Sequence, residues 1–69
     1  MTNAELKEAL LNKRTVVLTL NDGTEIHCRY VSGIIYREHN GGISVQAEVI
    51  DPNGRCQYSC SPKQIRYEV

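Results

Sequence analysis

The chain of 69 residues has no tryptophan and no phenylalanine, so its four tyrosines supply all of its large aromatic surface. Each tyrosine hydroxyl needs a hydrogen-bond partner or water, which favours partly buried rings. No apolar run approaches the ~20 residues of a membrane-spanning helix. The first ten residues include acidic side chains and no apolar signal segment. These absences favour a single small cytoplasmic domain with no membrane partner.

An excess of charge of one sign is also missing. Eight basic and eight acidic residues give a formal net charge of zero. Charge alone therefore predicts no strong nonspecific attraction to nucleic acid or to an anionic membrane.

The three cysteines are an odd number, which argues against the closed disulfide framework of a small secreted domain. We expect Cys28, Cys56 and Cys60 to be small core residues with free thiols. In a strand, Cys56 and Cys60 would lie roughly 13 Å apart, too far to bind one zinc ion together. His27 directly precedes Cys28 and would point to the opposite face, so no nucleophile–base pair forms. The sequence thus predicts no metal, no cofactor and no catalytic residue.

The composition changes after the first eleven residues, which hold leucine but neither valine nor isoleucine. Thr2 and Glu5 have the spacing of a capping box, and Asn3 is a rival N-cap. Leu6 and Leu10 would share one helical face, and Asn12 could end the helix in the left-handed conformation. We therefore predict a helix over residues 3–12 that packs its leucines on a sheet.

From residue 15 the apolar pattern has a period of two, which is typical of half-buried strands. Segments rich in Gly, Asn, Asp and Pro interrupt it at 21–23, 39–42, 51–54 and 61–64 and predict tight turns. The expected strands are residues 14–20, 24–37, 43–50, 55–60 and 65–69.

Alternation assigns the apolar residues of these strands to an inner and an outer side. Gly33 interrupts the longest strand, and a glycine at such a place favours a bend or bulge that lets one strand serve two halves of a curled sheet. The chain is therefore expected to be mainly β, with its helix followed by a strongly bent five-stranded antiparallel sheet that closes as a small barrel. The outer side would include Val17, Val31 and Ile50. The inner side would include Val16, Leu18, Leu20, Ile26, Cys28, Tyr30, Ile43, Val45, Ala47, Val49, Cys56, Tyr58, Cys60, Ile65, Tyr67 and Val69.

Two segments, VVLTLNDGTEIHCRYVSGI (16–34) and SPKQIRYEV (61–69), resemble the first motif and the closing strand of Sm-like, SH3-type small barrels. In the Sm type, RNA binding depends on an Asp and an Asn after the bent strand and on an Arg-Gly pair before the last strand. Asn40 and Arg66 match two of these positions, whereas Tyr36 and Tyr67 replace the Asp and the Gly. The resemblance also implies homo-oligomers formed through strand edges. Barrels this short are frequent among bacterial and phage accessory proteins.

Polar and aromatic side chains gather near the second turn and on the outer side of the sheet. Tyr36 could stack on a base, but acidic residues are interspersed among the positive charges. Exposed β-branched residues would suit strand addition or oligomerisation. We therefore favour a non-enzymatic protein-interaction adaptor or regulator, with a single-stranded RNA-binding protein as the alternative. The predicted binding residues are Arg29, Tyr36, Arg37, His39, Asn40 and Arg55.

Overall fold

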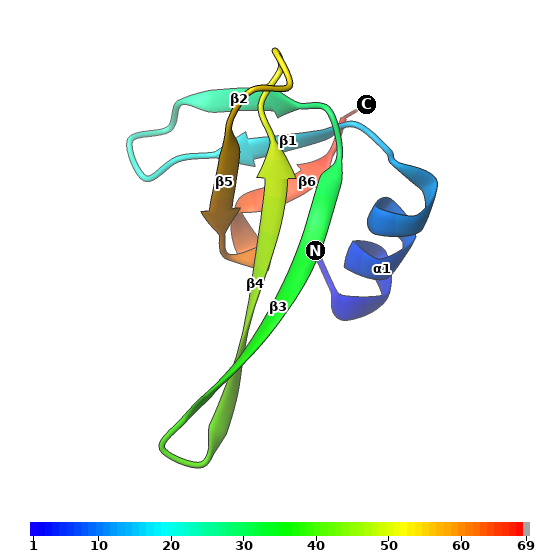
Figure 1. The fold of residues 1–69 in the computed structure, drawn as a ribbon. Coiled ribbons are helices and arrows are strands. Elements are labelled where there is room, and N and C mark those ends of the chain that lie inside the picture. Colours follow the sequence, from blue (N-terminus) through cyan, green and yellow to red (C-terminus); the bar gives the residue numbers. More distant parts are fainter. Residues whose placement is uncertain (69) are drawn as a thin grey trace.

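The computed structural model describes residues 1–68 and shows a mainly β chain with a short N-terminal helix (Figure 1). The helix and its length agree with the prediction, whereas the strands are more numerous than predicted and all but β4 are shorter. The elements are α1 (Asn3–Asn12), β1 (Val16–Thr19), β2 (Glu25–Cys28), β3 (Val31–His39), β4 (Gly42–Ile50), β5 (Gln57–Cys60), the 3₁₀-helix η1 (Pro62–Gln64) and β6 (Ile65–Tyr67).

Helix α1 begins at the predicted capping box. The Thr2 backbone N–H donates to Glu5 Oε1 at 2.9 Å, and the Glu5 N–H donates to Thr2 Oγ1 at 3.2 Å. Two amide groups without helical partners are thereby satisfied. The left-handed residue that ends the helix is Lys13, with φ of 52°, one residue later than predicted. The buried side chains of the helix are Leu6 and Ala9, so it packs on the sheets as expected.

The strands form two three-stranded sheets, ordered β2-β1-β6 and β3-β4-β5. The prediction of one five-stranded sheet closing as a barrel is therefore wrong, and residues 1–68 form no closed barrel. The predicted strand 24–37 divides at Arg29 and Tyr30, because β2 pairs with β1 whereas β3 pairs with β4. The Arg29 N–H donates to the Ile50 carbonyl, and the Ile50 N–H donates to the Tyr30 carbonyl. One chain segment thus crosses from one sheet to the other beside the end of β4.

A bulge lies at the glycine that was predicted to bend the chain. Val31 pairs with Val49 and Gly33 pairs with Glu48, so Ser32 is an extra residue in β3. The bulge therefore lies where the sequence predicts it. The change of sheet, however, takes place earlier, before β3 begins.

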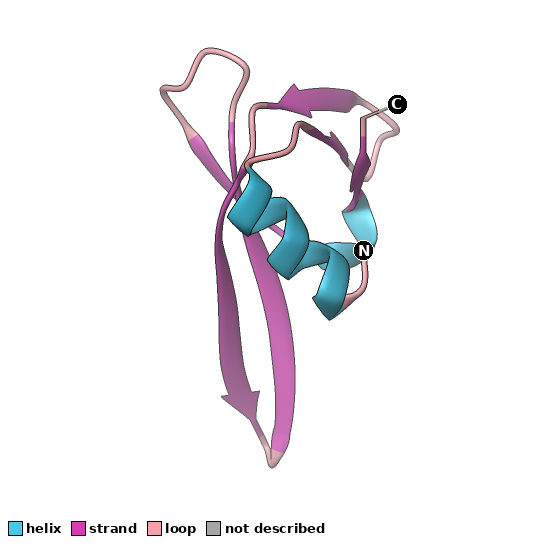
Figure 2. Ribbon diagram, turned by 90° about the vertical axis from the view of Figure 1, so that its right-hand side faces the viewer, coloured by secondary structure: helices cyan, strands magenta, loops and turns pink. Residues whose placement is uncertain are grey.

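The core fills the space between the two sheets, and α1 lies across one open side (Figure 2). The Tyr67 hydroxyl donates to the Glu5 carbonyl at 3.0 Å and fastens α1 to β6. Most of the predicted inner residues of the short strands are confirmed as buried. The buried core comprises Leu6, Ala9, Val16, Leu18, Cys28, Val31, Ala47, Val49, Cys60 and Ile65.

Some predictions of burial were wrong. Val31 is buried, because β3 passes under α1 at the start of the second sheet. Cys56 is exposed, because β5 begins only at Gln57 and leaves Cys56 in the preceding loop. Ile43 and Leu20 are also exposed, each beyond the edge of the core. Ile50 alternates with the buried Val49, on the outer side as predicted, and is half-buried. The prediction for Val69 lies outside the described residues.

Val17 is completely buried although it points away from the core. It is paired with His27 on one side and with Arg66 on the other. His27 Nδ1 lies 2.7 Å from Glu68 Oε1, and Arg66 Nη2 lies 2.5 Å from Glu25 Oε2. Because β1 lies between β2 and β6, the His27–Glu68 contact and the Arg66–Glu25 ion pair both join strands on either side of it. Alternation placed Val17 on the outer side correctly, but it did not predict that this position is buried.

Candidate binding surface

Strands β3 and β4 extend as a two-stranded ribbon well beyond the rest of the molecule (Figures 1 and 2). Only residues 47–50 of β4 pair with β5, so within residues 1–68 the lower part of the ribbon has no third strand. We call residues 34–46 the projecting hairpin. Its turn is formed by Asn40 and Gly41, with φ of 47° and 82°. Both positive values are those of a two-residue type I′ turn, which matches the natural twist of paired strands.

The register gives the projecting hairpin two distinct sides. One side carries Tyr36 with Val45 and Glu38 with Ile43, and it continues from the buried residue Ala47. Exposure along this side rises from 0% at Ala47 to 53% at Tyr36 and 74% at Ile43. The core-facing side of the sheet therefore continues past the core as an exposed apolar surface.

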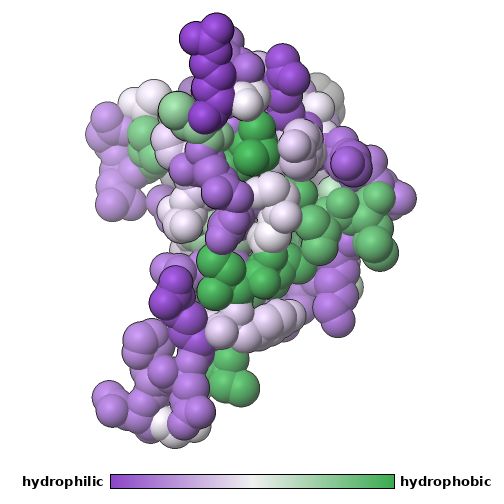
Figure 3. Space-filling view, in the orientation of Figure 1, coloured by the Kyte–Doolittle hydropathy of each residue, from purple (hydrophilic) through white to green (hydrophobic). Residues whose placement is uncertain are grey.

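The other side is more polar. It pairs Ile35 with Gln46 and Arg37 with Ser44, and His39 lies opposite Gly42. The Ser44 hydroxyl donates to the Arg37 carbonyl at 3.4 Å. In the view of Figure 3 the lower hairpin is mainly hydrophilic, and an apolar band crosses the body above it.

The structure divides the six predicted binding residues into two groups. Tyr36, Arg37, His39 and Asn40 all lie exposed on the projecting hairpin. Arg29 and Arg55 lie at the β4–β5 loop, at the opposite end of the molecule (Figure 1). The six residues therefore do not form one continuous surface.

Arg29 has a structural contact in the β4–β5 loop. Its Nε donates to the Pro52 carbonyl at 2.9 Å, and its guanidinium lies so close to Gly54 that a Cβ there would approach Nη1 to 3.3 Å. Asp51, 7% exposed, accepts the N–H groups of Arg55 at 2.6 Å and Cys56 at 3.0 Å. These backbone donors, that of Cys56 foremost, lower the pKa of the Asp51 carboxyl. The loop is thus held by Asp51 from within and by Arg29 from the segment between β2 and β3.

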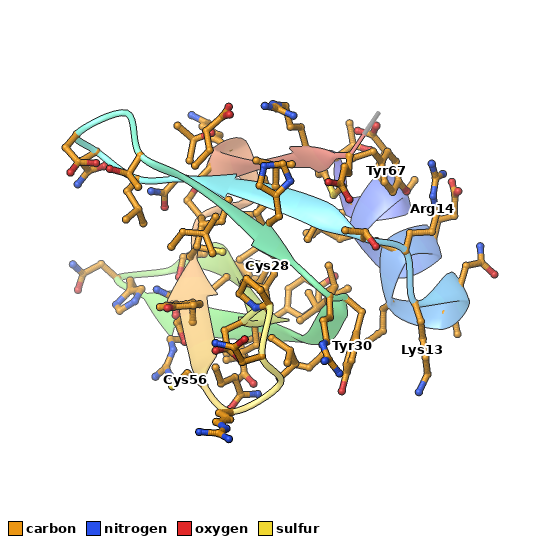
Figure 4. All side chains as sticks on the ribbon, turned by 90° about the horizontal axis from the view of Figure 1, so that it is seen from above. Lys13, Arg14, Cys28, Tyr30, Cys56 and Tyr67 are labelled. Atoms are coloured by element: carbon orange, nitrogen blue, oxygen red, sulfur yellow. The ribbon has the colours of Figure 1, made fainter. Side chains whose placement is uncertain are left out.

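Much of the remaining positive charge is also engaged within the chain. Arg14 lies 2.9 Å from Glu8 and stacks over Tyr67, with its Cζ 3.8 Å from the ring centroid (Figure 4). The Lys13 ammonium lies 5.5 Å from the Tyr30 ring centroid. Arg66, the residue matched to the Sm-type arginine, is paired with Glu25.

The cysteine environments differ from each other. Cys28 and Cys60 are buried in the core, whereas Cys56 is exposed. Figure 4 labels Cys28 and Cys56. Burial raises the pKa of the Cys28 thiol, and it raises that of Cys60 to about 11. His27 faces outward to Glu68, so it cannot act as a base for Cys28.

No pocket is found, and no group of three or more His, Cys, Asp or Glu residues could hold a metal ion within residues 1–68. No helix there has both the length and the apolar character required to cross a bilayer.

Sequence reasoning found the turn of the projecting hairpin but missed Ile43, which it placed in the core. The Asn-Gly pair between two alternating segments signals the hairpin. No local sequence signal shows where β5 ends along β4, and the position of that end determines which part of β4 a third strand covers.

Comparisons with protein-family models, with curated proteins and with solved structures find no match to this chain.

Proposed function

We propose that this protein is a non-enzymatic protein-interaction module, an adaptor or regulator, that binds its partner through the apolar side of the projecting hairpin. The observation that carries the proposal is the exposure of Tyr36 and Ile43 on a side that is continuous with the core. Aromatic side chains are enriched in protein interfaces, where they bury a large area with little loss of conformational entropy.

The geometry of the hairpin supports this role. Tyr36 lies directly opposite Val45, which is half-buried and supports the ring from the neighbouring strand. The turn at Asn40 and Gly41 has the conformation that fits strand twist, so the surface exists before a partner arrives. A preformed surface loses less entropy on binding.

Single-stranded RNA binding remains the alternative, and it rests on the hairpin as well. Tyr36 could stack on a base, with Arg37, His39 and Asn40 close by for the phosphate backbone. Against it, Arg29 and Arg55 lie at the far end of the molecule, and Arg66 is held by Glu25. The positive charge near Tyr36 is therefore confined to the hairpin, which favours the protein partner.

Affinity capture with matched variants tests the proposal. The tagged protein, the variant Tyr36→Ser and the control Leu11→Ser are each incubated with a nuclease-treated lysate of the source cells. Leu11 is a suitable control because it is 79% exposed and lies on α1, outside the hairpin. We expect one set of proteins that the wild type and Leu11→Ser both retain and that Tyr36→Ser loses. Equal capture by all three folded proteins would contradict the proposal.

A salt titration tests the alternative. A labelled oligouridine is added to the wild type and to Arg37→Gln at low and at physiological salt. RNA binding would appear at low salt, fall steeply with added salt and weaken in the variant. That outcome, together with failed protein capture, would replace the protein partner by RNA.

A further inference from the structure

The projecting hairpin has a free edge along β4. Residues 47–50 of β4 pair with β5, but residues 42–46 have no described strand on that side. In a two-residue hairpin the pair beside the turn, His39 with Gly42, is hydrogen-bonded, and the pairs then alternate along the ribbon. The backbone N–H and C=O groups of Ile43 and Val45 therefore point away from β3, toward the free edge.

This edge lacks the protection that exposed edges usually have. Charged side chains on an edge strand oppose its pairing with another chain. The free edge of β3 carries Arg37 and Glu38, and the outer strands of the other sheet carry Glu25, His27 and Arg66. By contrast, the five residues Gly42–Gln46 include no charge and two β-branched apolar residues. The hydroxyl of Ser44 is bonded back to the Arg37 carbonyl, so it does not block the edge.

We propose that a second copy of this chain pairs with residues 42–46 of β4 through its own residues 42–46, as antiparallel strands about a two-fold axis at Ser44. In this register Ile43 lies opposite Val45 of the second copy, and the symmetry repeats the contact. The four β-branched side chains form two apolar cross-strand pairs, and no charges of like sign are opposed. Residue 42 of the second copy lies opposite Gln46, next to Ala47, where the pairing of β4 with β5 ends.

Pairing in this way joins the apolar sides of both hairpins. Ile43, which is 74% exposed in the single chain, packs beside Val45 of the second copy. Tyr36, Val45 and Ile43 of the second copy then follow one another across a four-stranded sheet. The dimer does not depend on the proposed function, but it would present two copies of Tyr36 to a partner.

Sedimentation velocity over a concentration series tests the dimer. We expect the wild type to associate reversibly, and we expect Ile43→Glu to raise the dissociation constant by about tenfold or more, because it removes both apolar pairs and places two carboxylates in the interface. Leu11→Glu is the matched control, an acidic substitution of an equally exposed residue on α1, and it should leave association unchanged. Far-UV circular dichroism verifies that both variants are folded.

Amide hydrogen exchange locates the contact. With rising protein concentration the N–H groups of Ile43 and Val45 should exchange more slowly, whereas those of Tyr36 and Glu38 on the β3 edge should not change. A protein that stays monomeric up to millimolar concentration, an equal effect of both acidic variants, or protection along β3 would each overturn the proposal. A protein that stays monomeric but still captures a partner through Tyr36 would refute the dimer and leave the proposed function unaffected.

Discussion

Val17 offers a quantitative test of the two-sheet structure, because it lies on the outer side that alternation gave it and is nevertheless buried. Its side chain points away from the core, yet it is 0% exposed, and its cross-strand neighbours are His27, which contacts Glu68, and Arg66, which is paired with Glu25. In Val17→Ala two methyl-sized groups are removed. At ~0.8 kcal/mol for each buried group, the transfer loss is about 1.6 kcal/mol. A residual cavity adds to this loss, so we expect the free energy of unfolding to fall by about 1.5 to 2.5 kcal/mol.

Urea unfolding followed by far-UV circular dichroism at low micromolar concentration measures this loss. In a domain of this size, the same change lowers the melting temperature by roughly 6 to 20 °C. Ile43→Ala is the control, because a residue that is 74% exposed should change stability by no more than about 0.5 kcal/mol in a monomer. A Val17→Ala variant with a loss below about 0.5 kcal/mol and an unchanged m-value would refute the burial of Val17.

The stability contribution of the His27–Glu68 and Arg66–Glu25 contacts can be measured separately from that of Val17 packing. The four side chains of the pairs are about half exposed, so each pair should contribute only about 0 to 1 kcal/mol. Glu25→Gln and Glu68→Gln together should thus destabilise the chain less than Val17→Ala does. A larger effect of the double variant would show that electrostatics, and not apolar burial, stabilises this side of the sheet.

Further predictions concern the thiols, a buried carboxylate and the helix cap. Iodoacetamide should modify Cys56 alone in the folded protein, whereas Cys28 and Cys60 should react only after unfolding, as peptide mass spectrometry would show; rapid native labelling of Cys60 would contradict its raised pKa. The pKa of Asp51 is lowered in the folded state, so its stabilisation is complete above its unfolded pKa and is lost as pH falls through its folded pKa. Urea midpoints should therefore fall less steeply in acid for Asp51→Asn than for the wild type, and parallel pH profiles would exclude this role. Thr2→Ala should reduce stability by about 1 kcal/mol in thermal unfolding, and no change would show that the capping hydrogen bonds are unimportant.

Features that depend on neighbouring residues were predicted well. The capping box of α1 involves residues three apart, so Thr2 and Glu5 suffice to locate the start of the helix. The Asn40–Gly41 turn needs only two residues that tolerate positive φ. The bulge at Gly33 also appears at the expected place. In each case the determining interactions lie within a few residues along the chain.

Of the candidate surface, only part could be predicted. Tyr36, Arg37, His39 and Asn40 follow from the hairpin signal and do lie together at one end of the molecule. Arg29 and Arg55 have the same outward alternation, but alternation gives only the side of a strand and not its position in space. Their place at the other end depends on the chain crossing to the second sheet next to Ile50.

The sequence by itself determined the helix, the turns, the alternation of the strands and the absence of net charge, because these depend on local geometry and composition. Tertiary structure alone decided that the strands divide into two sheets, that Val17 is buried and that Ile43 is exposed. The physical reason is that strand pairing joins residues far apart in the chain. The position where β5 ends on β4 then decides which apolar residues become core and which remain on the surface.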